Sequence, residues 1–283
     1  MQVSHAGSDL EFDLQLYMLK FLLLKISAPI RWMVRHELWA HQISFCRNIS
    51  GERQRRALME TADYVEKHLA DVDSFSSPLD LLSEALRHAK VGPGMFLEFG
   101  VFSGTTINHI AGRIDGAVYG FDSFEGLPER WRDGMGAGFF KVEALPSVRA
   151  NVKLVKGWFD QTLPEFLKGH PEKVSFLHVD CDLYSSTKTI FAQLAQRIEV
   201  GTIIVFDEYF NYPGWQVGEY LAFQEFIKAS GLSYRYLGYN RFSEQVAVIV
   251  TDSESKNAFF TTALPGQGVP LEAEHQKPLS LPL

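Results

Sequence analysis

The stretch that most constrains the fold of this chain is Met95–Thr106, with the sequence MFLEFGVFSGTT. Its first residues, 95–99, are apolar apart from one glutamate and are long enough for one buried strand, which stops at Gly100. A glycine-rich turn follows, and a helix is expected from there to about Gly112. The stretch therefore predicts a strand, a tight turn and a helix.

The turn in this stretch has the chemistry of a ligand-binding loop. Gly100 and Gly104 lack a β-carbon, so the backbone can adopt unusual dihedral angles there and approach a ligand closely. Ser103 or Thr105 is expected to cap the helix. The free N–H groups at a helix start attract a carboxylate or a phosphate. We therefore expect these four residues to contact a cofactor.

A second apolar run, Ala117–Phe121, ends in Asp122, where a parallel sheet would offer a carboxylate to ribose hydroxyls. The two runs together predict a nucleoside site. A dinucleotide favours the loop G-x-G-x-x-G, whereas this chain has Glu98 just before the first glycine, and a carboxylate there would repel a diphosphate. That carboxylate suits the ammonium of a methionyl group. The charges therefore favour S-adenosylmethionine over a nicotinamide dinucleotide.

Composition limits the classes of protein to which the chain can belong. At 283 residues and 46% hydrophobic, it can bury one large core with additions, or form at most two domains. The 27 basic and 34 acidic residues give a net charge of −7 without a basic block, so we expect no nucleic-acid partner. Cys46 and Cys181 fit a reducing compartment, and the first residues lack the basic region of a secretory signal. We expect a soluble, cytoplasmic protein.

Helices are expected before the α/β part of the chain. They are Leu10–Ile26, which would break near Pro29, then Ile30–Cys46 and roughly Glu52–Leu69. The first is apolar on nearly all sides and must be covered, by the main domain, by a second copy of the chain or by a membrane surface. The membrane is the least favoured of the three, and a homo-oligomer, as a dimer, is expected. We assign this helical extension to residues 1–76.

From residue 77 the pattern alternates between strand and helix. Such alternation predicts a doubly wound, mostly parallel α/β domain over 77–252, with its ligands at the carboxyl ends of the strands. The Pro-rich and polar tail, 253–283, is expected to be partly disordered. The further strands expected are Val152–Val155, Val174–Val179, Gly201–Phe206 and an antiparallel pair, Leu232–Leu237 and Gln245–Val250; the helices expected are Leu79–Ala89, Leu163–Leu167, Ser185–Ile198 and Gln216–Ala229.

Carboxylates gather after two neighbouring strands. Asp180 and Asp182 follow one strand, and Asp207 and Glu208 follow the next. Four such groups in one cleft cannot all stay charged without a cation or strongly raised pKa values, and all-oxygen ligands select a hard ion such as Mg²⁺. The competing interpretation is that Asp182 only caps the following helix and that Glu208 is solvated. His178, inside the strand, is either a proton carrier in catalysis or a core residue.

Separate motifs, arranged in one order, give the chain a family resemblance. They are FLEFGVFSGTT, YGFDSFEGLPE, LVKGWFDQTLPEF, HVDCDLYSST and VFDEY followed by W-x-x-x-E, and they cover roughly Phe96–Glu225. With these motifs the chain resembles the macrocin O-methyltransferase family, class I enzymes that methylate hydroxyls on sugars of natural products. The resemblance implies an S-adenosylmethionine-dependent O-methyltransferase that acts on a small hydroxylated substrate.

The resemblance also implies where the cofactor binds. The glycine-rich loop would hold the methionyl end, Asp122 the ribose, and Gly157–Phe159 the adenine. The full set of candidate cofactor contacts is Glu98, Gly100, Ser103, Gly104, Thr105, Asp122, Ser123, Gly157, Trp158, Phe159 and Asp180.

By the same resemblance, Asp180, Asp207 and Glu208 would bind Mg²⁺, and Asp182 would be the general base. A cation on two adjacent oxygens would orient the acceptor hydroxyl and lower its pKa. The glycine-studded loop Ser123–Phe140 is expected to close over the substrate.

The chain departs from the family pattern at the acidic motifs. Asp180-Cys181-Asp182 stands where the family has Asp-Gly-Asp, Asp207-Glu208 stands where it has Asp-Asp, and the stretch Asn211–Glu219 also differs. Glutamate keeps the oxygen but lengthens the reach, so the metal would be shifted or absent. Three other functions stay open: a metal-free methyltransferase, for example on nitrogen; a nucleoside-binding protein without catalysis; and a nicotinamide oxidoreductase, against which Glu98 argues.

Overall fold

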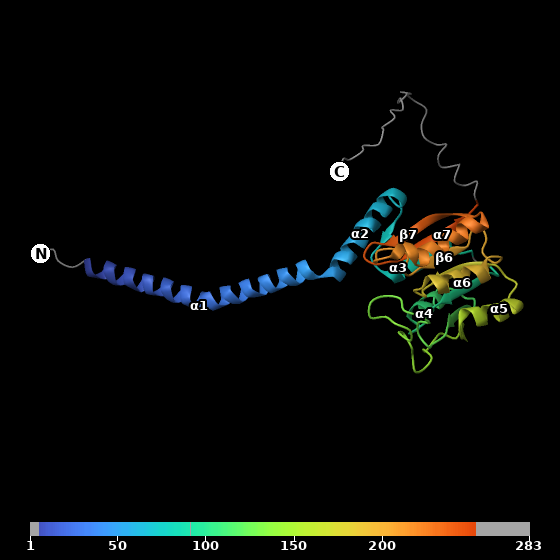
Figure 1. Cartoon of the computed structure of the whole chain (residues 1–283), viewed down its shortest axis with the longest axis horizontal. Coiled ribbons are helices and arrows are strands. Elements are labelled where there is room, and N and C mark those ends of the chain that lie inside the picture. Colours follow the sequence, from blue (N-terminus) through green and yellow to red (C-terminus); the bar gives the residue numbers. More distant parts are fainter. Residues whose placement is uncertain (1–5, 91, 253–283) are drawn as a thin grey trace, which may run out of the picture. The chain divides into compact units, whose positions relative to one another are not determined.

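The computed structural model describes residues 6–90 and 92–252, so the expected tail lies outside the described residues. Figure 1 labels the elements. The described chain forms two compact units. One ends at His68 and also includes Asn211–Pro213, and the other contains the remaining described residues.

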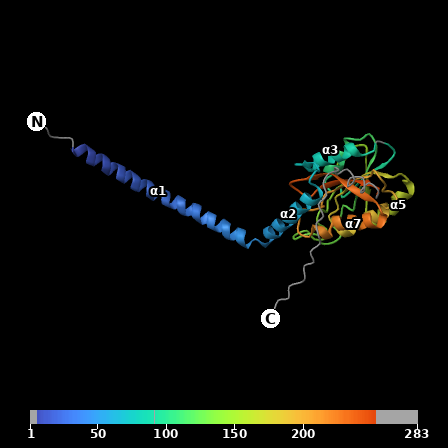
Figure 2. The same cartoon turned by 90° about the horizontal axis from the view of Figure 1, so that it is seen from above.

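The first unit is helical. α1 (Ala6–Arg47) and α2 (Ile49–His68) are separated by one residue (Figures 1 and 2). The predicted break at Pro29 is wrong, since Pro29 lies inside α1. Inside a helix, proline loses the hydrogen bond of its own N–H and crowds the carbonyl four residues earlier, but its φ angle is compatible with a helix, so α1 continues through it. The first two predicted helices are therefore one.

The short segment Asn211–Pro213 belongs with α2 through hydrogen bonds. The N–H of Asn211 donates to Oγ1 of Thr61 at 2.9 Å, and its carbonyl accepts from Nε2 of Gln54 at 2.7 Å. Thr61 is buried, which protects the first of these bonds from water.

Large apolar side chains of α1 are exposed. Within the described part of the chain, none of the helices combines the length and the hydropathy that a membrane span requires. We still predict that a second surface covers these side chains. The exposed residues are Met18, Phe21, Ile30, Trp32, Met33, Val34, Leu38 and Trp39.

The second unit is built on one eight-stranded sheet with the order β1-β7-β8-β6-β5-β2-β3-β4. β8 runs antiparallel to both of its neighbours, and the other pairs are parallel. This confirms the predicted doubly wound, mostly parallel sheet and the antiparallel final pair. The strands are β1 (Ser74–Phe75), β2 (Met95–Phe99), β3 (Val118–Asp122), β4 (Val152–Lys156), β5 (Val174–Val179), β6 (Ile203–Phe206), β7 (Ser233–Asn240) and β8 (Val246–Thr251).

Helices cover both faces of this sheet. Figure 2 shows α3 on one side and α7 on the other. The first layer consists of α3 (Pro78–His88) and α4 (Thr105–Ala111), and the second of α5 (Phe159–Gly169), α6 (Tyr184–Leu194) and α7 (Glu219–Ser230).

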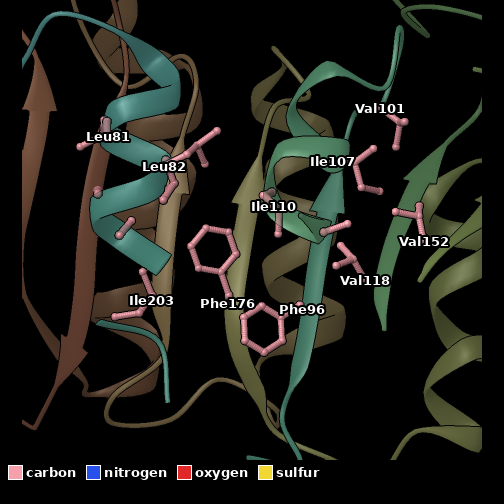
Figure 3. Packing of buried hydrophobic residues seen from close by; sticks show 14 of the residues in the cluster. Leu81, Leu82, Phe96, Val101, Ile107, Ile110, Val118, Val152, Phe176 and Ile203 are labelled. Carbon is pink, nitrogen blue, oxygen red and sulfur yellow. The ribbon is translucent and has the colours of Figure 1, made fainter. Parts of the chain in front are cut away.

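The alternation of side chains along each strand supplies a core to each layer. On one face, the buried sheet residues Phe96, Phe176 and Ile203 belong to a single apolar cluster with residues of α3 and α4 (Figure 3). On the other face, Phe206 packs on Phe191 of α6 and on Phe223 of α7, with ring centroids 6.2 and 4.9 Å apart. The two cores hold the sheet between its helices.

Two local predictions about helix starts are wrong. The N-cap of α4 is Gly104, which has φ 79° and gives no side-chain cap, while the hydroxyls of Ser103 and Thr105 lie 3.0 Å apart and bond to each other. A side-chain cap needs an extended residue at that position, and the left-handed glycine prevents it. The helix expected from Gln216 is divided at Gly218 into η1 (Trp215–Val217) and α7.

We expect replacement of Phe176 by Ala to lower the free energy of unfolding of the second unit by about 3–5 kcal/mol, because it leaves a cavity in the middle of the sheet. Val200→Ala is the matched control, since that side chain is 46% exposed. Urea unfolding followed by circular dichroism measures both. A Phe176→Ala loss as small as that of the control would contradict this account of the core.

Candidate active site

Backbone hydrogen bonds continue past the ends of the strands at the carboxyl edge of the sheet. The residue that follows each of β2, β5 and β6 donates its N–H to a carbonyl near the end of the neighbouring strand. These three residues are therefore held level with one another at the carboxyl edge of the sheet. The bonds run from Gly100 to Phe121, from Asp180 to Phe99 and from Asp207 to Val179, each at 2.9 Å.

Gly100 is required by the close approach of β2 and β5. Its φ is 93°, and a β-carbon placed on it would lie 1.6 Å from the backbone carbonyl oxygen of Asp180. A side chain at this position would push the end of β5 away. The group that approaches this glycine closely in the structure is the neighbouring strand, and the expected approach to a ligand stays a prediction.

A cavity of about 750 Å³ opens at this edge. The expected closing loop contributes Trp131, Met135 and Phe140 to its wall, and Arg132 of the loop forms an ion pair with Glu244. Most of the predicted site residues line the same cavity: Gly100, Asp122, Ser123, Trp158, Phe159, Asp180, Asp182, Asp207 and Glu208.

Other predicted residues are placed differently. Gly157 supports the site through its backbone, because its N–H donates to the carbonyl of Asp122 at 3.0 Å. Glu98 and His178 are completely buried in the sheet. The predicted residues outside the described lining of the cavity are Glu98, Ser103, Gly104, Thr105, Gly157 and His178.

Asp122 organises the glycine-rich loop. Its carboxylate accepts the backbone N–H groups of Val101 at 2.8 Å, Phe102 at 2.9 Å and Phe124 at 2.7 Å. The carboxylate therefore ties the loop after β2 to the end of β3. A carboxylate offers about four acceptor positions, so capacity for a ribose hydroxyl is left. Binding of the ribose by Asp122 stays a prediction.

Three of the acidic residues after β5 and β6 lie in surroundings that disfavour their charged forms. Burial, followed by the repulsion of Asp207, raises the pKa of Asp180 well above its usual value. Burial also raises the pKa of Asp182 to about 7, against the opposing effect of Arg132. Burial and then the neighbouring Asp207 raise the pKa of Glu208. A bound cation would relieve this repulsion.

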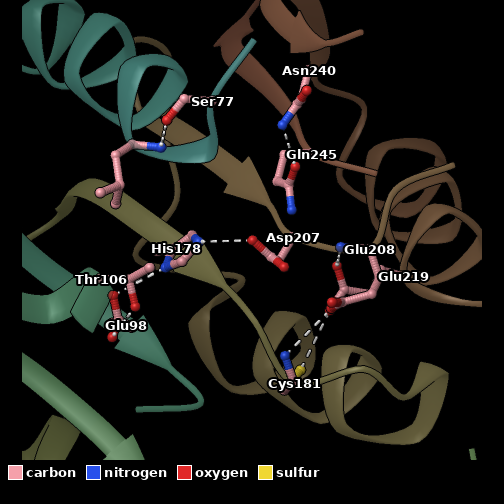
Figure 4. Close-up of polar contacts among 11 residues, drawn as sticks. Ser77, Glu98, Thr106, His178, Cys181, Asp207, Glu208, Glu219, Asn240 and Gln245 are labelled. Atoms are coloured by element: carbon pink, nitrogen blue, oxygen red, sulfur yellow. Dashed lines mark hydrogen bonds and ion pairs between the residues drawn. The ribbon is translucent and has the colours of Figure 1, made fainter. Parts of the chain in front are cut away.

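Glu219 is a site residue that the sequence interpretation missed. It begins α7, is 0% exposed, and accepts the backbone N–H of Cys181 at 3.4 Å and that of Glu208 at 3.3 Å (Figure 4). It therefore connects the segments after β5 and β6. The signal was present in the W-x-x-x-E motif. Glu244 and Gln245, which the antiparallel β8 brings to the same edge, were also missed.

Glu98 and His178 interact with each other beneath the cavity. Nδ1 of His178 lies 3.0 Å from Oε2 of Glu98, and Oε1 of Glu98 accepts the hydroxyl of Thr106 at 3.1 Å. Nε2 of His178 faces Oδ1 of Asp207 at 4.0 Å. Figure 4 shows these four residues in a row that leads from α4 to the end of β6. Burial is the largest effect on Glu98 and raises its pKa.

Among the described residues, His178, Asp180 and Asp207 form a group that could hold a metal ion. Each offers one ligand atom, and these atoms all lie within 4.8 Å of one another. Around a six-coordinate ion with bonds of about 2.1 Å, ligand atoms are about 3 to 4.2 Å apart. The largest separation in this group would therefore have to shorten by roughly half an ångström for the three atoms to bind such an ion. The donor set fits, although it includes His178 and leaves Glu208 outside.

The sheet order, with one antiparallel strand between two parallel neighbours, and the cavity beside the glycine-rich loop define the fold of a class I methyltransferase. Residues 76–233, more than half of the chain, match the family model described as Macrocin-O-methyltransferase (TylF). The chain belongs to the macrocin O-methyltransferase family.

Two relatives come from Streptomyces. The chain is 29% identical over 143 residues to 8-demethyl-8-(2,3-dimethoxy-alpha-L-rhamnosyl)-tetracenomycin-C 4'-O-methyltransferase of Streptomyces olivaceus, covering 41% of this chain and 53% of the relative. It is 29% identical over 147 residues to demethyldecarbamoylnovobiocin O-methyltransferase of Streptomyces niveus, covering 43% and 55%. The chain thus spans about half the length of these relatives.

A solved structure is also similar. The calicheamicin methyltransferase CalS11 is 24% identical, with a TM-score of 0.49, over 60% of this chain and 78% of that chain.

We expect Gly100→Ala to abolish binding of S-adenosylhomocysteine and to cost about 2–5 kcal/mol of stability, through the strained φ and the clash with Asp180. Gly116→Ala is the control, because a β-carbon there meets nothing within 4 Å. Calorimetric titration and urea unfolding measure the two effects. Wild-type affinity in Gly100→Ala would show that the contact between β2 and β5 does not shape the site.

Proposed function

We propose that this protein transfers a methyl group from S-adenosylmethionine to a hydroxyl group on a sugar of a small natural product. The observation that carries the proposal is one cavity that brings the start of the glycine-rich loop, an aromatic wall and a buried carboxylate, Asp182, together. Membership of the family supports the reaction. The name of one relative, a 4'-O-methyltransferase of a rhamnosyl compound, supports a sugar as the acceptor.

The residues proposed for the cofactor divide by their position. Asp122 and Ser123 are proposed for the ribose, with Trp158 and Phe159 for the adenine, and these four line the cavity. The loop residues Gly100, Ser103, Gly104 and Thr105 are proposed for the methionyl end. When bound, S-adenosylmethionine supplies a methyl group on a sulfonium that is already activated. The protein therefore has only to position the acceptor oxygen and to remove its proton.

Asp182 is proposed as the general base. Its side chain lines the cavity, and its pKa of about 7 allows it to hold a proton near neutral pH. As the bond between oxygen and methyl carbon forms and the bond between sulfur and carbon breaks, the hydroxyl proton passes to Asp182. The products are the methyl ether and S-adenosylhomocysteine.

A divalent cation is proposed on Asp180 and Asp207, whose ligand atoms converge at adjacent strand ends. Glu208 follows Asp207 directly and lines the same cavity, so it stays a candidate ligand. When bound, the cation supplies positive charge that lowers the pKa of the acceptor hydroxyl.

Two asparagine variants test these roles. Asp207→Asn should lose the cation and most turnover while still binding S-adenosylhomocysteine. Asp182→Asn should retain both ligands and lower kcat by about 10²- to 10⁴-fold, because only the proton acceptor is removed. Asparagine tolerates the left-handed backbone of residue 182, where φ is 66°. Calorimetry and methyl transfer to a panel of glycosides provide the readouts, with the exposed Asp115→Asn as control.

Two other outcomes would each contradict part of the proposal. Full activity in the presence of a chelator would contradict the cation alone and would indicate a metal-free methyltransferase. Binding of S-adenosylhomocysteine without turnover of any glycoside or amine would indicate a nucleoside-binding protein.

We also propose that α1 forms a contact between copies of the chain in a homodimer. Trp32 and Trp39 are 68% and 60% exposed, and they lie seven residues apart, which places them on one side of the helix. Replacing both by Ser should lower the subunit count in light scattering after gel filtration. Leu145→Ser, at a position that is 52% exposed in the second unit, is the control. An unchanged count would exclude this contact.

A further inference from the structure

His178 and Glu98 are polar residues in an otherwise apolar layer. Phe96 precedes Glu98 on the same face of β2, and Phe176 precedes His178 on the same face of β5. Both phenylalanines belong to the apolar core on that face of the sheet. Both polar side chains are 0% exposed. Burying such groups costs free energy unless each of their polar atoms finds a partner. A structural role alone predicts that every polar atom of the pair is satisfied.

One atom of the pair is not satisfied. Glu98 is held by Thr106 on one oxygen and by Nδ1 of His178 on the other. Nε2 of His178 is fully buried and has no hydrogen-bond partner among the described residues. Its nearest charged neighbour is the carboxylate of Asp207, at 4.0 Å. This distance is too long for a hydrogen bond, but it suits two ligands on opposite sides of one ion.

The pairing of the strands directs this nitrogen toward the acidic edge. Glu98 lies opposite His178, and His178 lies opposite Val205, so the three residues form one row across β2, β5 and β6. Asp180 comes two residues after His178, and Asp207 comes two residues after Val205. Both carboxylates therefore extend from the same face toward the cavity. The hydrogen bond that Nδ1 of His178 makes with Oε2 of Glu98 holds the ring in the orientation that aims Nε2 at the carboxylate of Asp207.

We propose that His178 is a nitrogen ligand of the divalent cation held with Asp180 and Asp207, and that Glu98 is the positioning residue that orients its ring. This inference rests on the cation in the proposed function and changes the set of atoms that bind that cation. The site becomes a mixed nitrogen and oxygen site, which accepts Mn²⁺ or a later first-row ion better than an all-oxygen site does.

The geometry distinguishes this role from that of a proton carrier. A general base must come within hydrogen-bond reach of the substrate, directly or through one water. His178 lies outside the described lining of the cavity, whereas Asp180 and Asp207 form part of that lining. An ion held by these carboxylates would lie between Nε2 and the substrate. His178 therefore acts on the ion, and Asp182 remains the group that contacts the substrate.

The test uses Mn²⁺ alone, bound to the full chain, and pulsed electron paramagnetic resonance. Directly coordinated imidazole should produce nitrogen-14 modulation in the wild type. His178→Gln should lose that modulation, and His88→Gln, at an exposed position of α3, should retain it. Glu98→Gln should retain the modulation but bind Mn²⁺ about 10- to 100-fold more weakly, because only the support of the ring is altered.

Mn²⁺ that binds to the wild type without nitrogen modulation overturns the assignment, whatever the variants do. If His178→Gln does not fold, nitrogen-15 labelling of histidine in the wild type replaces it, and an unchanged spectrum overturns the assignment. Methyl transfer that depends on Mn²⁺ while nitrogen modulation is absent overturns the role of His178 alone. Failure of the wild type to bind Mn²⁺ overturns both the role of His178 as a ligand and the proposed cation. Methyl transfer measured in the presence of a chelator then tests the remaining part of the proposed function.

Discussion

The structure depends on the continuation of the β-ladder beyond the ends of its strands. One backbone N–H after each of β2, β5 and β6 bonds to the neighbouring strand, so the first residues of three loops are positioned by the sheet. Loops positioned in this way can carry functional groups with the precision of a strand. The close approach at Gly100 is part of the same constraint, because a side chain there would separate β2 from β5 and with them the loop from Asp180.

The same constraint concentrates negative charge. Asp180, Asp182 and Asp207 are brought to one edge, where burial and mutual repulsion raise the pKa values of the first two. Glu219 adds a further buried carboxylate, whose pKa is also raised by burial. Its hydrogen bonds to the backbone at Cys181 and Glu208 oppose this shift and connect the two acidic segments. The site is therefore an arrangement that a cation would stabilise, with Glu98 and His178 as a buried support beneath it.

Much of the second unit could be predicted because its signals are local. Val174–Val179 is a continuous apolar run and forms β5 with the predicted bounds, and the loop after Met95–Phe99 has the glycines that its turn needs. The two-residue β1 was missed because it has too few residues to show a period. The predicted break at Pro29 was wrong because proline disfavours a helix interior without excluding it, and α1 continues through this residue.

The sequence by itself determined the alternation of strand and helix, the glycine-rich loop and the acidic residues that end two strands. Each of these depends on neighbouring residues and on the short period of a strand or helix. Only the tertiary structure decided that Glu98 bonds to His178, that Glu219 connects two loops and that Nε2 of His178 faces Asp207. These contacts join residues on different elements, up to 80 positions apart for the first, and their geometry depends on strand order and register, which no local pattern contains.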